Sequence, residues 1–357
     1  MFFKFKNKKI TNMISIVPNN IIKFEDEAGQ YNFPIKRTLK MMDIMGYKEH
    51  RLFNDSVILS DVAVYGLNYM FENNIINKED IDALLFVSNC TDHIIPPTSN
   101  IIQGKLGLKT DMICLDIMQA CAGFVVGLLQ SFMLLDSGSV NKVVLINGGT
   151  MKSRVSKKDR NSWPLIGESC SITVIENGGN NDVFASVYMD GVNSNALIIP
   201  AGGFRMPSSE ETAKLQTLED GNERALDHLT MEGVGVFNFV QTVVPEELKK
   251  LMDYAKIYDK DIFAYLFHQP NKFMLEKLAD KMGMERSKMP SNVVENFGNS
   301  DSGTIPLVTT YNYGSLFEQE EKTVCFSGFG AGLTCASIIM NFGKLENCKL
   351  IEYGKNR

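Results

Sequence analysis

The segment Met112–Leu129, MICLDIMQACAGFVVGLL, decides how the rest of the chain is interpreted. An apolar, β-prone run leads into an apolar helix that carries Cys121 in its first turn. Unpaired N–H groups and the helix dipole at such a position stabilise a thiolate. The small neighbours Ala120, Ala122 and Gly123 leave room beside the sulfur. Cys121 is therefore a candidate nucleophile, with a buried inert thiol as the alternative.

Composition indicates a globular protein and disfavours several partner classes. The 357 residues are 44% hydrophobic, which is enough for one large core or two fused ones. The formal net charge of −6 does not favour binding to nucleic acid. The N-terminal MFFKFKNKKI is not followed by an apolar segment of signal-peptide length, and no apolar run has the length of a membrane span. We expect a cytoplasmic protein without membrane or nucleic-acid partners.

Cysteine and histidine spacing argues against metal chemistry. The seven cysteines are scattered and never form CxxC, so neither a disulfide framework nor a zinc site is expected. The four histidines show no HxxxH or HExxH spacing. The glycine-rich segment GFGAG at 328–332 lacks the spacing of a dinucleotide fingerprint. We therefore expect reduced thiols and no metal or redox cofactor.

Strand-like and helix-like runs alternate along the first half. The predicted strands are Met13–Val17, Ile81–Ser88 and Lys142–Asn147, and the predicted helices are Ser56–Asn74 and Asn100–Leu106. Continuous apolar strands in such an alternation indicate a sheet covered on both faces. The polar region that follows Pro18 gives no clear prediction through Gly46.

A coarse internal repeat suggests that the fold is duplicated. LGLK at 106–109 precedes the strand leading to Cys121, and KVVLINGG follows from Lys142. MGME at 282–285 precedes the segment 293–297 and a turn at Asn299, and KTVCFSGFG follows from Lys322. The prediction is a first half, residues 1–180, and a second half, residues 181–357. Cys121 and Asn299 would then occupy equivalent strand-to-helix turns near a shared axis. Chance similarity of short apolar strands is the alternative.

Two polar residues of the second half are candidates for the same site. His268 ends the predicted strand Phe263–Phe267, just before a predicted helix at Lys272–Met282. A histidine there can equally be a core residue with its hydrogen bonds satisfied. Asn299 can equally be only a turn residue.

Four motifs together resemble the β-ketoacyl-ACP synthase III family. They are ACAGF at 120–124, HQPN at 268–271, FGNS at 297–300 followed by Pro306, and GFGAG at 328–332. DR at 159–160 and LTMEG at 229–233 are similar to further landmarks of the family. The resemblance implies an α/β thiolase fold with two duplicated halves packed in αβαβα layers.

The resemblance also implies a mechanism and its partners. Cys121 would take the acyl group from an acyl-CoA or an acyl carrier protein. His268 Nε2 and the Asn299 amide would then donate hydrogen bonds to malonyl-ACP as carbon dioxide leaves. Backbone N–H groups of Cys121 and Ala331 would form the oxyanion hole. The family is dimeric, and 92–98 (DHIIPPT) matches the loop that closes the partner's acyl pocket, so a homodimer is expected.

Departures from the family pattern concern the substrates. The N-terminal tryptophan that stacks on the CoA adenine in the family has no counterpart here, and the single tryptophan is Trp163, near Arg160. Asp301 stands where the family usually has a small residue. We expect Arg160, Trp163, Asn271 and Asp301 to bind substrate, and a carrier-bound acyl donor to be preferred over free acyl-CoA.

Three functions are consistent with these residues. The first is decarboxylative Claisen condensation with a malonyl thioester, and the second is transfer of the Cys121 acyl group to a hydroxyl or amine acceptor. The third is a non-catalytic partner subunit, which the intact set of Cys121, His268 and Asn299 disfavours.

Overall fold

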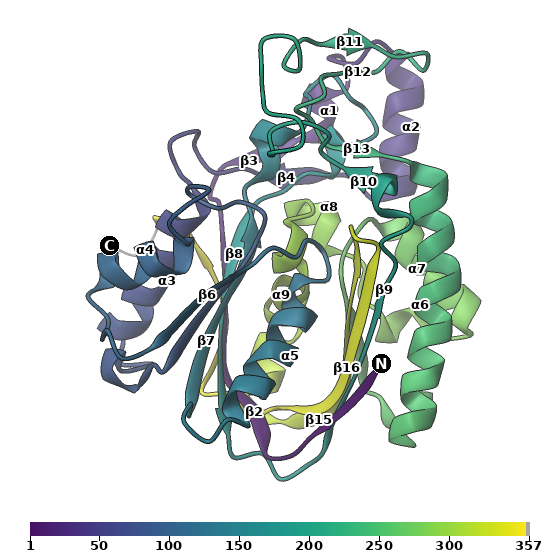
Figure 1. Ribbon diagram of the computed structural model, residues 1–357. Helices are drawn as coiled ribbons and strands as arrows, with labels where there is room; N and C mark the ends of the chain where they lie inside the picture. Colours follow the sequence, from purple (N-terminus) through teal and green to yellow (C-terminus); the bar gives the residue numbers. More distant parts are fainter. Residues whose placement is uncertain (355–357) are drawn as a thin grey trace.

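Two β-sheets, with helices between them and on both outer faces, form the body of the molecule (Figure 1). The computed structural model describes residues 1–354. The six-stranded sheet has the order β17-β2-β8-β7-β5-β6, and the five-stranded sheet has the order β1-β9-β16-β15-β14. Their strands are β1 (Phe2–Phe5), β2 (Lys8–Val17), β5 (Ala83–Val87), β6 (Ile113–Ile117), β7 (Lys142–Gly149), β8 (Ser169–Asn177), β9 (Val183–Met189), β14 (Ala264–Phe267), β15 (Glu321–Gly330), β16 (Thr334–Gly343) and β17 (Asn347–Glu352).

The helices make this a five-layer αβαβα arrangement, as the resemblance implied. Two helices lie between the sheets, namely α5 (Gly123–Leu135) and α9 (Thr304–Gln319). The outer face of the six-stranded sheet is covered by α3 (Leu59–Glu72) and α4 (Thr98–Leu106). The outer face of the five-stranded sheet is covered by α6 (Gly233–Ala255) and α7 (Lys272–Met282).

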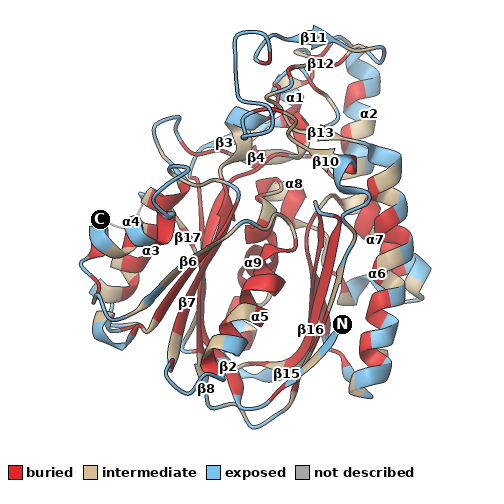
Figure 2. Cartoon of the chain, in the orientation of Figure 1, coloured by how far each residue is buried: buried red, intermediate tan, exposed pale blue. Residues whose placement is uncertain are grey.

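Burial follows these layers (Figure 2). The central cluster joins α5 and α9 to the inner faces of both sheets, with Phe124, Leu128 and Phe326 fully buried. Two further clusters lie under α3 and α4 and under α6 and α7. The apolar helix α5 is therefore buried on nearly all of its faces, as expected of a helix between two sheets. Its N-terminus is fixed at the centre of the molecule.

The two sheets share a pairing pattern. In the first, β5 runs parallel to β7, while β7 with β8 and β8 with β2 are antiparallel. In the second, β14 runs parallel to β15, while β15 with β16 and β16 with β9 are antiparallel. The strands β2, β5, β7, β8 thus correspond in chain order to β9, β14, β15, β16. This match supports duplication, and the boundary at residue 180 stays a prediction. The first strand of the chain belongs to the second sheet and the last strand to the first sheet, because β1 pairs with β9 and β17 pairs with β2.

One expected element is wrong. The predicted strand-to-helix turn before Asn299 requires a strand at 293–297, and the structure has the short helix α8 (Val293–Phe297) there. Among residues 1–354, the five-stranded sheet ends at β14 and has no counterpart of β6. Apolar runs this short do not distinguish a strand from a buried helix. Cys121 follows a strand and Asn299 follows a helix, so their surroundings are only partly equivalent.

A cap lies over the ends of the strands that carry the candidate residues (Figure 1). It contains helices and short strands, namely α1 (Phe24–Glu27), α2 (Ile35–Met45), β3 (Ile21–Lys23), β4 (Glu49–Arg51), β10 (Leu197–Ile198), β11 (Gln216–Thr217), β12 (Glu223–Arg224) and β13 (Thr230–Met231). Within the described part of the chain, no helix is long and apolar enough to cross a membrane.

Candidate active site

Cys121 lies just before α5 and against the glycine-rich end of β15. A Cβ atom on Gly330 would lie 2.7 Å from the Cys121 Cβ and 2.8 Å from its Sγ. A Cβ on Gly328 would lie 2.7 Å from the Ala122 Cα. Only glycine at these two positions lets β15 approach the cysteine segment so closely. The GFGAG motif therefore packs directly against the candidate nucleophile.

The thiol of Cys121 is harder to ionise than its place before a helix suggested. Burial raises its pKa well above the ordinary value, and the carboxylate of Asp301 raises it further. Backbone N–H groups of Cys121 and Ala331 hydrogen-bond the sulfur and oppose this shift in part. The expectation of an easily ionised thiol is thus wrong in direction. The same two N–H groups are the pair expected to form the oxyanion hole, and both face the sulfur.

His268 is buried at the end of β14 and is held neutral. Its backbone N–H donates to the Ser327 carbonyl at 2.8 Å, and its ring meets Phe329 edge-on with 5.7 Å between centroids. Burial lowers its pKa to about 3. At neutral pH the ring is therefore an uncharged imidazole that can donate from one nitrogen only.

Thr304, the first residue of α9, decides which ring nitrogen of His268 carries the proton. Its Oγ1 lies 2.7 Å from His268 Nδ1 and 3.0 Å from the Asp301 carbonyl oxygen. The hydroxyl has one proton to donate. When it donates to Nδ1, Nε2 carries the ring proton and can donate to a substrate. When it donates to Asp301 instead, Nε2 is an acceptor.

Asn299 presents donors because its backbone and its side-chain oxygen are both held. Its N–H donates to the Leu165 carbonyl at 2.7 Å, and its carbonyl accepts from the Gly167 N–H at 3.0 Å. Its Oδ1 accepts from the Asp301 N–H at 2.9 Å. The amide orientation is thereby fixed, and Nδ2 is left to donate hydrogen bonds elsewhere.

The three predicted residues line one cavity of about 470 Å³. The rest of its wall is largely apolar and comes from α2, α6 and α7 and from nearby loops. The apolar lining residues are Met45, Leu165, Leu197, Met231, Val234, Val236, Phe237, Val240, Pro270, Phe273, Met274 and Phe329. Phe237 and Phe273 stack with 6.0 Å between ring centroids. A thioester can therefore reach Cys121 along an apolar path.

The residues predicted to bind substrate have different outcomes. Asn271 lines this cavity and also caps α7, accepting the Met274 N–H at 2.8 Å. Trp163 is 2% exposed and donates from Nε1 to Glu27 at 3.1 Å, so its ring offers no free face for stacking. Arg160 donates to Asn222 at 2.9 Å and lies over the Phe33 ring, outside the lining of this cavity.

Asp301 is also placed differently from the prediction. It lies outside the lining of the apolar cavity, and its carboxyl interacts with the thiol of Cys121. Burial raises its pKa to about 7. The carboxyl therefore faces the nucleophile rather than an incoming substrate group.

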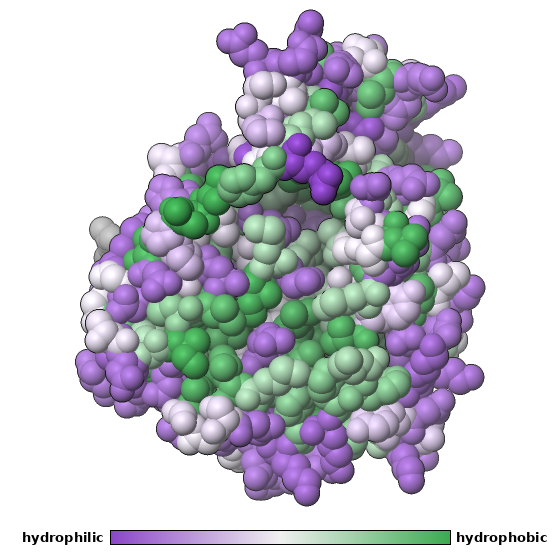
Figure 3. Space-filling view, in the orientation of Figure 1, coloured by the Kyte–Doolittle hydropathy of each residue, from purple (hydrophilic) through white to green (hydrophobic). Residues whose placement is uncertain are grey.

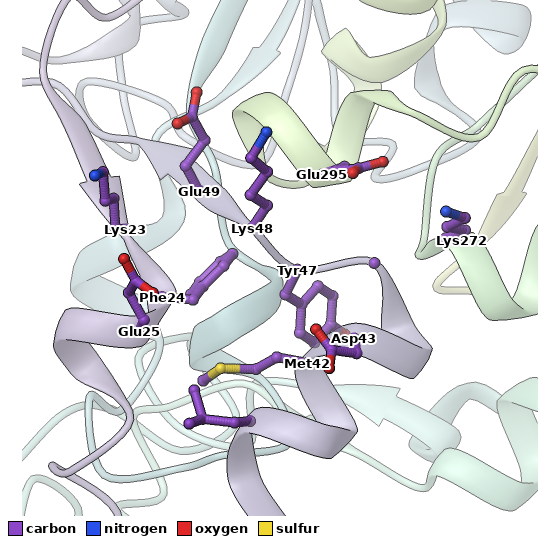
Figure 4. Close-up of a pocket in the computed structure, with 12 residues that line it drawn as sticks. Lys23, Phe24, Glu25, Met42, Asp43, Tyr47, Lys48, Glu49, Lys272 and Glu295 are labelled. Atoms are coloured by element: carbon purple, nitrogen blue, oxygen red, sulfur yellow. The ribbon is translucent and has the colours of Figure 1, made fainter.

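A second cavity of about 360 Å³ adjoins the first through the shared residue Tyr47 (Figure 4). Its lysines come from different parts of the chain, and acidic residues lie among them. The lysines are Lys23, Lys48 and Lys272, and the acidic residues are Glu25, Asp43, Glu49 and Glu295. In the close-up, Lys272 lies apart from the other two lysines. The charges are mixed, so this cavity does not select for one sign of ligand.

Sequence reasoning missed two groups of site residues. Thr304 had no signal beyond its place between Asn299 and Pro306. The apolar wall from α6 was also missed, although LTMEG at 229–233 marks the start of that helix. No group of three or more His, Cys, Asp or Glu residues in the described part of the chain could hold a metal ion.

Comparisons with known proteins show similarity to 3-oxoacyl-[acyl-carrier-protein] synthases III. Two family models match, described as 3-oxoacyl-[acyl-carrier-protein] synthase III at residues 115–191 and as its C-terminal part at residues 252–342. A Campylobacter jejuni protein, provisionally named a 3-oxoacyl-[acyl-carrier-protein] synthase 3, is 28% identical and covers 99% of both chains. The β-ketoacyl-[acyl-carrier-protein] synthase III of Fusobacterium nucleatum is 27% identical over 83% of this chain and 88% of its own. A crystal structure of a 3-oxoacyl-(acyl-carrier protein) synthase from Burkholderia xenovorans superposes with a TM-score of 0.90 at 25% identity, covering 99% of both chains.

Proposed function

The chain belongs to the 3-oxoacyl-[acyl-carrier-protein] synthase III family of acyltransferases, and on this basis we propose decarboxylative condensation with a malonyl thioester as its reaction. Cys121 takes an acyl group from a thioester, and the acyl-enzyme then condenses with malonyl-ACP as carbon dioxide leaves. One observation carries the proposal: Cys121, His268 and Asn299, from three distant parts of the sequence, line a single cavity.

Acyl loading is supported by the surroundings of Cys121. Attack of its sulfur on the thioester carbonyl places negative charge on the carbonyl oxygen. The N–H groups of Cys121 and Ala331 face the sulfur and are suited to stabilise that oxyanion. The thiol of the donor leaves, and the acyl group stays on Cys121 as a thioester.

Decarboxylation is supported by two neutral donors. The malonyl thioester oxygen accepts hydrogen bonds from Asn299 Nδ2 and His268 Nε2, with Thr304 donating to His268 Nδ1. These donors stabilise the enolate that forms as carbon dioxide is lost. Because burial holds the pKa of His268 at about 3, both donors are uncharged over the whole neutral range. The enolate carbon then attacks the acyl group on Cys121 and expels the sulfur as a thiolate, which takes up a proton from water to regenerate the thiol.

A homodimer in the cytoplasm is part of the proposal. β6 is the outermost strand of its sheet, and Ile113 and Leu115 on it are each 40% exposed. Exposed apolar side chains at such an edge are typical of an interface. Figure 3 shows apolar side chains gathered over the face that carries β6 and α5. All seven cysteines are free, which favours a reducing compartment.

A second candidate function is acyl transfer without decarboxylation. The observation that favours it is the carboxyl of Asp301 beside Cys121, because such a group can accept a proton from a hydroxyl or amine acceptor. On that scheme His268 and Asn299 would not act on a malonyl group, and no carbon dioxide would form.

The two half-reactions can be measured separately. We expect His268→Ala and Asn299→Ala to retain most acyl loading, followed by intact-protein mass after exposure to acetyl-CoA. Decarboxylation of malonyl-ACP should fall by roughly two to three orders of magnitude in each variant, the usual effect of removing an oxyanion donor. Equal losses in both steps would show that the two residues do not have separate roles.

A further inference from the structure

Asp301 is held beside Cys121 by its own backbone. It has a φ of +60°, a left-handed conformation that Asp and Asn adopt more readily than most residues. Its N–H donates to Asn299 Oδ1 at 2.9 Å, and its carbonyl oxygen lies 3.0 Å from Thr304 Oγ1. The two contacts come from residues on either side of it in the sequence. They place the backbone of Asp301 between Asn299 and the start of α9.

Space for this carboxyl exists because β7 ends in glycine. A Cβ on Gly149 would lie 3.1 Å from the Asp301 Cβ and 3.2 Å from the Ser300 carbonyl oxygen. The titratable groups that feel the Asp301 carboxylate are the thiols of Cys121 and Cys90, whereas the ring of His268 interacts with the backbone of Asp301. The thiol of Cys121 is the side chain that acts on this carboxyl directly, and it favours the ionised form.

The imidazole of His268 is a poor candidate for the base that accepts the thiol proton of Cys121. Burial lowers the pKa of His268 to about 3, and its Nδ1 lies 2.7 Å from the Thr304 hydroxyl. The thiol itself has a strongly raised pKa, so a free thiolate is costly at neutral pH. Acyl loading therefore benefits from a group that accepts the thiol proton during attack.

We propose that Asp301 is the general base of acyl loading, an inference that rests on the proposed function of Cys121. The carboxylate accepts the Cys121 thiol proton as the Sγ bonds to the thioester carbonyl carbon. When the carbon–sulfur bond of the donor breaks, the carboxylic acid returns that proton to the departing sulfur. The donor leaves as a thiol, the carboxylate is regenerated, and no other reactant is needed.

This role sets a pH dependence with a defined sign. The carboxyl must be ionised to accept a proton, and burial raises its pKa to about 7. The rate of acyl loading should therefore rise as pH increases through about 7 and be flat above it. A carboxylic acid with an ordinary pKa would show no change across this range.

Asp301→Asn tests the proposal because asparagine keeps the shape and tolerates the positive φ. Single-turnover loading from acetyl-CoA and from acetyl-ACP is followed by intact-protein mass between pH 5.5 and 9. We expect loading at pH 8 to fall about 10²-fold, the lower end of general-base effects. The step near pH 7 should disappear. Cys90→Ala, which removes the other thiol facing Asp301, should leave both the rate and the pH midpoint unchanged.

Alkylation of Cys121 by iodoacetamide separates proton acceptance from electrostatics, because that reaction proceeds through the thiolate. Removing the carboxylate lowers the pKa of the thiol, so Asp301→Asn should be alkylated faster at pH 8 while it is acylated more slowly. If both reactions become faster, Asp301 only suppresses the thiolate and the proposal is overturned. If both become slower, Asp301 only shapes the site, and the proposal is overturned as well. Absence of loading in the unchanged protein with either donor would instead contradict the proposed function.

Discussion

The hydroxyl of Thr304 is the smallest group on which the proposed chemistry depends. It lies 2.7 Å from His268 Nδ1, and in the proposed reaction it donates to this nitrogen, which leaves the proton of the ring on Nε2. Thr304→Val keeps the shape but removes the donor. We expect decarboxylation of malonyl-ACP to fall by about 10²-fold, on the scale of losing an oxyanion donor. Acyl loading should change by less than about threefold, because the hydroxyl does not touch Cys121.

Thr304→Ser provides the matched control. It restores a hydroxyl at the same atom and should recover most of the decarboxylation. The interpretation fails if Thr304→Ser is as impaired as Thr304→Val, or if Thr304→Val loses loading and decarboxylation to the same extent. Stopped-flow detection of carbon dioxide and intact-protein mass give the two rates.

Motifs in the sequence marked Cys121, His268 and Asn299 as candidates, and the structure brings the three to one cavity, but the motifs gave no information on the electrostatics around them. The three stand in distinctive local patterns, so their identity could be predicted without coordinates. The pKa of Cys121 could not, because it depends on burial and on Asp301, which is distant in the sequence. The burial of Trp163 could not be predicted either, because it depends on packing against the cap, and a buried ring cannot stack on a substrate.

At the scale of elements, β4 supports the segment that holds Asn299. His50 on β4 is fully buried, and its Nδ1 lies 2.6 Å from the Ile166 carbonyl oxygen. Its Nε2 lies 3.2 Å from a carboxylate oxygen of Glu27 on α1. Ile166 sits between the two residues whose backbones bond Asn299. The cap therefore contacts the active site through this histidine.

We expect His50→Gln to weaken decarboxylation while acyl loading is retained. The longer glutamine amide reaches the position of Nε2 rather than Nδ1, so the contact with Ile166 is lost. His50→Asn places an amide nitrogen near the position of Nδ1 and should keep the contact. Carbon dioxide release should therefore fall at least about tenfold in His50→Gln, or roughly 1.4 kcal/mol of transition-state stabilisation. Equal rates in the two variants would contradict a positioning role for His50.

Elements with clear end signals were predicted best. The helix α7 begins after Asn271 and ends before Gly283, and the sequence predicts its bounds as the structure has them. The segment 293–297 lacks such signals and was wrongly taken as part of a strand-to-helix turn. The region between Pro18 and Gly46 gave no prediction, because α1, α2 and β3 are short and are stabilised by packing within the cap.

For the whole molecule, the exposed edge at β6 predicts association. Leu115→Glu places a charge on this edge, and by light scattering we expect the variant to be a monomer and the unchanged protein to be a dimer. Tyr258→Glu, at a residue that is 48% exposed and follows α6, a helix of the other sheet, is the control and should stay dimeric. A monomeric, fully active unchanged protein would refute the proposed dimer.

The preference for one acyl donor over another depends on the whole entrance to the cavity. The cavity in front of Cys121 is largely apolar, and the single tryptophan of the chain is buried beneath the cap. Loss of an aromatic stack on adenine costs on the order of 1–3 kcal/mol. We expect kcat/KM for an acyl group on a carrier protein to exceed that for the same group on CoA by at least about tenfold. An equal or higher value for acetyl-CoA would rule out this preference.

The central claim is that an acyl group on Cys121 is consumed in a condensation that releases carbon dioxide. It is tested by loading the protein with a labelled acetyl group, mapping the adduct by peptide mass, and adding malonyl-ACP labelled in its free carboxyl. We predict that the adduct is on Cys121 alone and that one carbon dioxide is released for each acyl group consumed. Cys121→Ser should show neither the adduct nor this coupled release. Loss of the acyl group from Cys121 to a hydroxyl or amine acceptor, with no labelled carbon dioxide formed from malonyl-ACP, would contradict the account.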